Sequence, residues 1–127
     1  MEQMIIIISL LFFHWIADFI VQTRYQAENK NESEEALFIH CVTYSLVLTM
    51  GLFISVIIIK GIILTAIQLS LFYMSIYILH FITDFITSRV TTYYYKTGKM
   101  KKFWVVIGFD QWLHVVQILF IYLTFIV

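Results

Sequence analysis

Four long apolar segments, separated by short polar ones, dominate the sequence. They cover residues 4–22, 36–59, 61–88 and 103–127. Each is close to or above the roughly 20 helical residues that cross a hydrocarbon layer of about 30 Å. Between the second and third segments, Lys60 and Gly61 place a charge beside a flexible residue, which predicts a tight turn. The pattern therefore predicts an all-α fold, a single domain built as an integral membrane bundle of four transmembrane helices.

Composition supports a bilayer environment. The chain is 61% hydrophobic and 13% charged and has no proline, whereas soluble proteins average about 25% charged residues. Its only cysteine, Cys41, excludes an internal disulfide. We expect the lipid bilayer as the main partner and no nucleic acid, and the sequence leaves oligomerisation open.

Basic residues are distributed unevenly between the two sides of this bundle. Seven of the eight Lys and Arg residues lie in the connections 23–35 and 89–102, and only Lys60 lies on the other side. An excess of Lys and Arg marks cytoplasmic loops. We therefore expect a multi-pass protein of the cell (inner) membrane, with both long connections cytoplasmic and both termini outside the cytoplasm.

All three aspartates lie four residues from a histidine in otherwise hydrophobic sequence. Residues four apart share a face of a helix, so each aspartate lies beside its histidine. The pairs are His14 with Asp18, His80 with Asp84, and Asp110 with His114, and His40 is the remaining histidine. In the topology above, all seven lie toward the cytoplasmic ends of the four spans. The sequence therefore predicts that they meet at one level of the bilayer.

Imidazole and carboxylate groups are the usual ligands of zinc, manganese and iron. We interpret the seven residues as metal ligands for one or two divalent ions, with zinc favoured and manganese or iron as alternatives. Two ions and a bridging hydroxide would balance the charge of three carboxylates. Asp18, Asp84 and Asp110 are also the candidate catalytic groups, as bridging ligands or general base.

Further polar residues extend the predicted site. Gln22 and Ser88 lie one helical turn beyond an aspartate and could orient the ligands. Arg24, Lys30 and Arg89, in or next to the cytoplasmic connections, are placed to attract an anionic lipid or a phosphate-bearing substrate.

The polar signatures also resemble a known family. They read His14-x-x-x-Asp18-Phe19-x-x-Gln22, Ala27-Glu28-Asn29-Lys30, His40, His80-x-x-x-Asp84 and Asp110-Gln111-x-x-His114. In order and spacing they resemble the bacterial and phage membrane proteins grouped as domain-of-unknown-function family 3307, over nearly the whole chain. The resemblance adds Gln111 to the candidate site but implies no activity. The proline that often follows the first glutamine of that family is Thr23 here.

A looser similarity of pattern links the chain to membrane-bound metal-dependent hydrolases. We therefore predict a hydrolase that acts on a lipid-linked or amphipathic phosphoester or ester near the cytoplasmic face. The alternatives are a metal-ion or proton transporter, and a small assembly subunit whose hydrogen-bonded His and Asp side chains fix helix packing. Polar residues thin out in the outer halves of the spans, which favours a site over a transport path.

Overall fold

The computed structural model describes residues 1–127, and the chain is helical with no strand. Its elements are α1 (Glu2–Trp15), a π-helical turn η1 (Ile16–Val21), α2 (Arg24–Asn29), α3 (Glu34–Lys60), α4 (Ala66–Lys96) and α5 (Met100–Phe125). Four helices are long and apolar enough to cross a membrane: α1 with η1, α3, α4 and α5. The predicted fold class, an all-α bundle of four spans, is confirmed.

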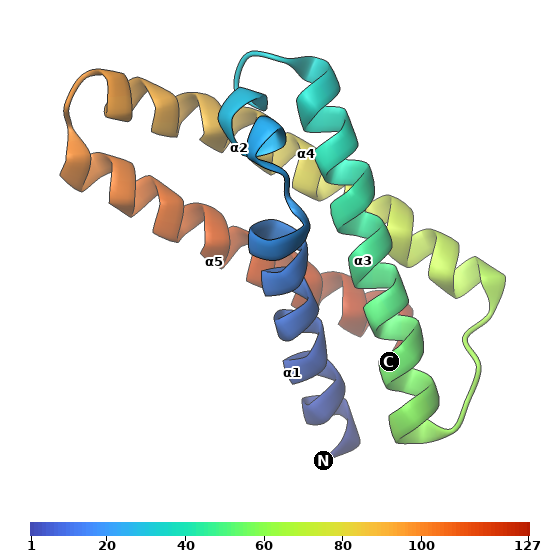
Figure 1. The fold of residues 1–127 in the computed structure, drawn as a ribbon. Helices are drawn as coiled ribbons and strands as arrows, with labels where there is room; N and C mark the ends of the chain where they lie inside the picture. Colours follow the sequence, from blue (N-terminus) through green and yellow to red (C-terminus); the bar gives the residue numbers. More distant parts are fainter.

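The four spans form two antiparallel pairs that cross obliquely (Figure 1). One pair consists of α1 and α3, and the other is the α4–α5 hairpin. The pairs join mainly through α3 and α4, whereas α1 and α5 make little contact with each other. Near α2, the hairpin extends away from the first pair, so the two pairs diverge at this end of the molecule.

The helix ends differ from the expected span ends. Gly61, at φ 65°, ends α3 in the left-handed conformation that glycine adopts without strain. The connection that follows is longer than the predicted tight turn, because residues 61–65 are not helical and α4 begins at Ala66, where Thr65 caps it. On the other side, α4 continues to Lys96 and α5 begins at Met100. Most of the stretch 89–102 is therefore helical rather than a long loop.

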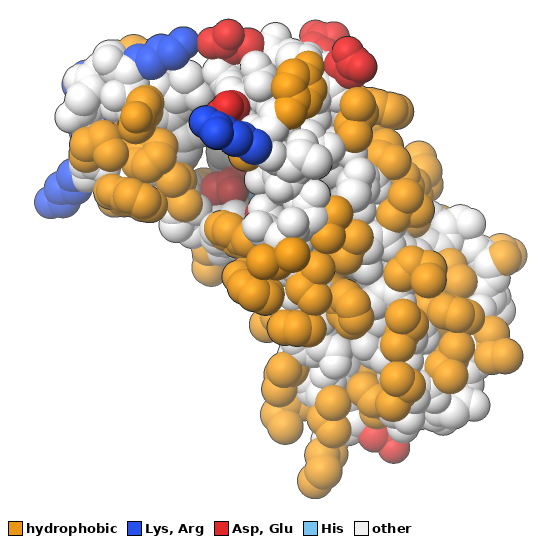
Figure 2. Space-filling view, viewed as in Figure 1, with side chains coloured by type: hydrophobic (Ala, Val, Ile, Leu, Met, Phe, Trp, Pro, Cys, Tyr) orange, Lys and Arg blue, Asp and Glu red, His pale blue; other side chains and the backbone are white.

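A tightly packed apolar core fills the half of the bundle away from α2. It includes the fully buried residues Ile6, Leu10, Leu48, Leu52, Phe72, Ile76, Ile118 and Ile121. Large apolar side chains also cover much of the outer surface, whereas charged side chains gather at the end that carries α2 (Figure 2). Exposed apolar sides and a closed apolar interior are typical of a helix bundle in lipid, and the polar groups collect at one end.

Candidate metal centre

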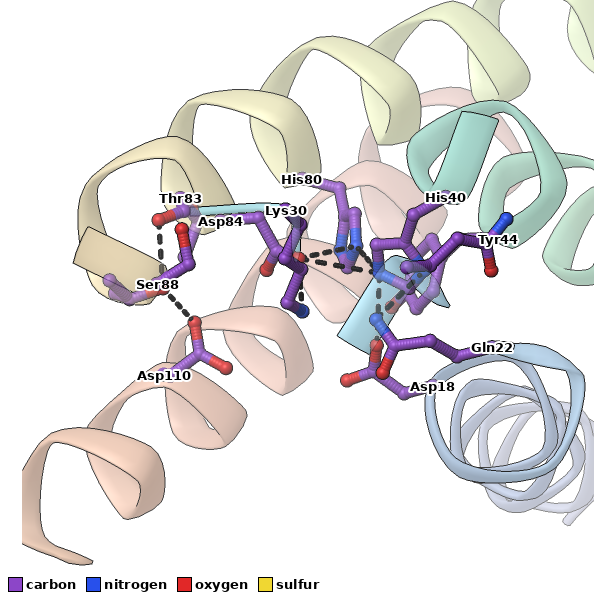
Figure 3. Close-up of polar contacts among 12 residues, drawn as sticks. Asp18, Gln22, Lys30, His40, Tyr44, His80, Thr83, Asp84, Ser88 and Asp110 are labelled. Atoms are coloured by element: carbon purple, nitrogen blue, oxygen red, sulfur yellow. Dashed lines mark hydrogen bonds and ion pairs between the residues drawn. The ribbon is translucent and has the colours of Figure 1, made fainter. Parts of the chain in front are cut away.

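Six of the seven predicted ligands form one buried cluster where the two helix pairs cross. All six are at most 6% exposed, and together they come from all four spans (Figure 3 shows part of the cluster). They are His14, Asp18, His40, His80, Asp84 and His114. The four-residue spacing places each pair of ligands on the inner face of its helix.

Asp18 lies in the only π-helical turn of the chain, η1. Such turns insert an extra residue into a helix and are frequent at functional sites. The turn begins two residues after His14 and is capped by Gln22, where the backbone leaves the helical conformation. Both Asp18 and His14 are buried. The π-helical turn therefore determines how the Asp18 carboxylate is presented to the other three spans.

Three ligand atoms lie within 3.3 Å of His40 Nε2. His40 Nε2 lies 3.3 Å from Asp18 Oδ1, 3.3 Å from Asp84 Oδ2 and 3.1 Å from His80 Nε2. His80 Nε2 lies 3.6 Å from the same Asp84 oxygen. Atoms bound to one tetrahedral zinc at about 2.0–2.1 Å lie roughly 3.3–3.4 Å from each other. These four separations are close to that value, and ligand atoms of Asp18, His40 and His80 lie within 4.8 Å of one another, so this side of the cluster could hold one ion.

The second oxygen of each buried carboxylate faces His114 instead. Asp84 Oδ1 lies 3.4 Å from His114 Nε2, and Asp18 Oδ2 lies 3.9 Å from His114 Nδ1. Nitrogen and oxygen atoms of His14, Asp18 and His114 lie within 4.8 Å of one another. Asp18 and Asp84 thus stand between a pair formed by His40 and His80 and a pair formed by His14 and His114.

Gln22 is the hydrogen-bond partner of His40 Nδ1. With its amide oriented so that every atom has a partner, Gln22 accepts hydrogen bonds from His40 Nδ1 and Lys30 Nζ, both at 3.2 Å. The proton assigned to Nδ1 leaves the Nε2 lone pair facing the oxygens of Asp18 and Asp84. Converging acceptors repel unless a positive charge lies between them. The arrangement could therefore hold a metal ion between these groups.

Both nitrogens of His14 have hydrogen-bond partners that are not themselves candidate ligands. Nδ1 accepts from the Tyr44 hydroxyl at 2.7 Å, and Nε2 lies 3.1 Å from Gln111 Oε1. The Gln111 amide in turn donates to Asp18 Oδ2 at 2.9 Å. His114 has no hydrogen-bond partner on either nitrogen. His114 is therefore free to ligate, and His14 can ligate only by giving up a hydrogen bond.

Tyr44 is a central residue of the cluster, although the sequence points to it only weakly. It is fully buried, and its ring stacks on His80 with centroids 3.6 Å apart. Its position four residues after His40 places it on the same face of α3. That spacing marks it as a polar neighbour of His40, but only the fold places its hydroxyl against His14 on another helix.

Lys30 brings a partly buried positive charge to the cluster. Its Nζ lies 2.7 Å from Asp84 Oδ2, and the two side chains are 19% and 1% exposed. Burial disfavours the ammonium form, but the carboxylates of Asp84 and Asp18 outweigh burial and raise the pKa of Lys30 above its ordinary value. Lys30 is therefore charged at neutral pH.

Asp110, the seventh predicted ligand, lies at the edge of the cluster. It accepts hydrogen bonds from Thr87 at 2.5 Å and Gln111 at 3.2 Å, and it lies 3.8 Å from His114 Nε2. It belongs to none of the three groups whose atoms converge within 4.8 Å. Its side chain remains 14% exposed and faces a cavity.

This cavity, of about 670 Å³, connects the cluster with the end of the molecule that carries α2. Figure 2 shows it as a hollow with acidic side chains inside. Its lining includes Asp18, Gln22, Lys30, Thr87, Ser88, Asp110 and Gln111. The cavity gives the cluster access from the end of the bundle that carries α2, whereas the apolar core fills the other end.

Of the residues predicted to assist the site, Arg24 and Arg89 do not reach it. Arg24 forms an exposed ion pair with Glu28 at 2.7 Å, and Arg89 donates to the backbone oxygen of Phe85. Neither side chain lines the cavity. Ser88 does line it, and its buried hydroxyl has no hydrogen-bond partner.

Comparison with known proteins places the chain in a family. The sequence model of the family described as "Protein of unknown function (DUF3307)" matches residues 6–127, which include every residue of the cluster. The chain therefore belongs to this family, as its polar signatures indicate. Searches of curated proteins and of solved structures gave no match.

Proposed function

We propose that this member of the DUF3307 family is a membrane-embedded, metal-dependent hydrolase that cleaves a lipid-linked or amphipathic phosphoester or ester near the cytoplasmic face. One observation carries the proposal. Two buried carboxylates each present their two oxygens to different histidines, at the inner end of a water-accessible cavity. Packing alone needs no such convergence of unpaired acceptors, since a buried polar group without a partner is costly.

The divided carboxylates favour two ions over one. His40, His80, Asp18 Oδ1 and Asp84 Oδ2 supply one set of four ligand atoms. The second set would consist of Asp84 Oδ1, His114, Asp18 and His14. To join it, His14 would have to give up one of its hydrogen bonds, such as the one to Tyr44. Asp18 and Asp84 would then each contribute one oxygen to either set. Nitrogen and carboxylate donors without thiolate suit zinc, manganese or iron, of which we favour zinc.

Hydrolysis needs a Lewis acid, a proton acceptor and access for substrate. Divalent ions held by this cluster would activate water and shield the charge of the ester. Asp110 lies outside the converging groups and faces the cavity, so we assign it as the base that accepts the proton of the attacking water. Water oxygen bonds to the phosphorus or acyl carbon, the ester bond breaks, and the proton passes to the leaving alkoxide.

The position of the site in the membrane follows from charge. The cavity opens toward the end that carries residues 23–35 and 89–102, which hold seven of the eight basic residues. The positive-inside rule assigns that end to the cytoplasm and both termini to the opposite side. A transport path would have to continue through the core of Leu48, Leu52 and Phe72, which is fully buried and apolar. This one-sided access favours an enzyme over a transporter.

The test uses protein purified in detergent without a histidine tag, stripped with a chelator and reloaded with zinc or manganese. We expect hydrolysis of p-nitrophenyl phosphate or p-nitrophenyl acetate to depend on the reloaded metal. The Asp110→Asn variant should keep its metal and lose activity by about 10²-fold or more, because it lacks the proton acceptor. Thr43→Ala is the matched control, since Thr43 bonds only the backbone of Ile39, away from the cluster. Full activity in the stripped protein or in Asp110→Asn would overturn this proposal.

A further inference from the structure

The cavity beside the cluster has two chemically different walls. The wall formed by α4 carries hydroxyl groups at Thr87, Ser88, Thr91 and Thr92. Ser88 is 8% exposed, and its hydroxyl has no partner in the protein. A buried hydroxyl that faces a cavity without a partner is a donor available to a ligand, because leaving it unpaired is costly.

The opposite wall is apolar and belongs to η1 and α5. Phe19, Phe103 and Ile107 line it. The spacing of Phe103, Ile107, Gln111 and His114 places these residues on one face of α5, so this face changes from apolar to polar toward the cluster. Phe19 is 57% exposed, and its neighbour Ile20 is 61% exposed, as expected for side chains in contact with lipid tails.

The apolar wall lies where the bundle is least closed. Contacts between α1 and α5 are sparse, and the α4–α5 hairpin diverges from the first helix pair toward α2 (Figure 1). An amphipathic molecule that entered this cavity sideways from the bilayer would pass between η1 and α5. Its chain would lie against Phe19 and Ile107, and its head group would reach the hydroxyl wall and the cluster.

Charge indicates the kind of head group. With all three carboxylates ionised, Asp18 and Asp110 in the cavity lining, Asp84 behind it and Lys30 sum to a net charge of −2, which would repel an anion. Two divalent ions reverse this charge to +2, which complements a phosphate monoester dianion. Lys30 Nζ and the free Ser88 hydroxyl add hydrogen-bond donors beside the cluster.

Resting on the proposed function, we propose that the substrate is a long-chain lipid phosphate monoester that enters between η1 and α5. Its phosphate binds at the metal cluster beside Ser88 and Lys30, and its chain leaves past Ile107 and Phe19 into the bilayer. In the reaction, water oxygen bonds to phosphorus and the bond from phosphorus to the lipid oxygen breaks. The products are the lipid alcohol, which takes a proton from water, and inorganic phosphate.

The test compares two substrates in metal-loaded protein in nanodiscs: dioleoyl phosphatidate and soluble p-nitrophenyl phosphate. Ile107→Trp fills the apolar wall, and Val105→Trp is the matched control because Val105 is 64% exposed on α5 and does not line the cavity. We expect Ile107→Trp to slow phosphate release from phosphatidate about tenfold or more, with turnover of the soluble substrate and metal content within about twofold of wild type. Val105→Trp should change neither rate. Equal loss on both substrates, or no loss on phosphatidate, would overturn the proposal.

A binding measurement separates this inference from the proposed function. Retention of radiolabelled phosphatidate by the metal-loaded protein is compared with retention of dioleoylglycerol and of inorganic phosphate. Lateral entry is supported if the protein prefers phosphatidate, if Ile107→Trp abolishes this preference and if Val105→Trp preserves it. This holds even if neither phosphate ester is hydrolysed. In that case only the hydrolase proposal fails. Hydrolysis of the soluble substrate without preferential retention of phosphatidate overturns the lipid substrate and leaves the hydrolase standing.

Discussion

Lys30 and Asp84 form a partly buried ion pair, with Nζ 2.7 Å from Oδ2, across 54 positions of sequence. The pair ties the short helix α2 to the inner face of α4, and it places a fixed positive charge beside the metal ligands. Because Lys30 and three aspartates share this end of the bundle, the charge of the site depends on a contact between a loop segment and a span.

Lys30→Met tests the ion pair. Removing one partner of a buried pair leaves the other charge uncompensated, so we expect the metal-free protein to lose about 3 kcal/mol of stability. The measurement is thermal or denaturant unfolding in detergent. Arg24→Gln is the control, because the Arg24–Glu28 pair is exposed at 88% and 58% and should contribute nothing measurable. Equal destabilisation by both variants would show that the Lys30–Asp84 contact has no special role.

The bridging carboxylates predict an unequal loss of metal. Asp84 faces both histidine sets, so Asp84→Asn should lose both ions, whereas His40→Ala should lose one and keep the other. Elemental mass spectrometry of the tag-free variants gives the ratio of metal to protein. Two ions in wild type, one in His40→Ala and fewer than one in Asp84→Asn are expected. One ion in wild type would indicate a mononuclear centre. No bound ion would indicate that the cluster only holds the helices together by hydrogen bonds.

Tyr44→Phe removes the hydroxyl that donates to His14. We expect a loss of about 1 kcal/mol of stability, the usual net value of one hydrogen bond. If His14 is a ligand, metal affinity should change by about 10- to 100-fold, because partners that orient a ligand have effects of that size. Competition with a chromophoric chelator measures affinity. An unchanged affinity would place His14 outside the coordination sphere.

Gly51 lies where α3 packs against Phe13 of α1. A Cβ at Gly51 would overlap the Phe13 ring, so Gly51→Ala should destabilise the protein by about 1–3 kcal/mol. Gly108 has nothing within 4 Å of its Cβ position and is exposed on α5. Gly108→Ala should therefore be neutral or slightly stabilising, as expected for a helix interior. Unfolding midpoints of the two variants, measured side by side, test the packing of α1 on α3.

Cysteine labelling tests the membrane orientation. The native Cys41 is fully buried and should not react with a membrane-impermeant maleimide. In spheroplasts, we expect Gln3→Cys to be labelled from outside, and Glu34→Cys and Lys101→Cys to react only after lysis. Reactivity in the reverse order would place both termini in the cytoplasm and move the proposed site to the outer face.

Much of the architecture follows from the sequence because it depends on one-dimensional patterns. Apolar runs of suitable length specify the spans, and the four-residue spacing of His80 and Asp84 fixes which residues share a helix face. The gathering of six predicted ligands at one level follows from topology alone, since it needs only the alternating direction of the spans. The resemblance to the family rests on the same signatures, and the family match confirms it.

The sequence does not determine which side chains of the cluster contact one another. Helical spacing does not reveal that Asp18 lies in a π-helical turn, that Lys30 folds back onto Asp84, or that Gln111 and Tyr44 hold His14. It also does not exclude Arg24 and Arg89 from the cavity. Each of these facts depends on contacts between side chains of different helices. The way in which the two helix pairs cross determines those contacts. The sequence thus determines the spans, the helix faces and the kinds of ligand, whereas only the tertiary structure decides which oxygen faces which histidine.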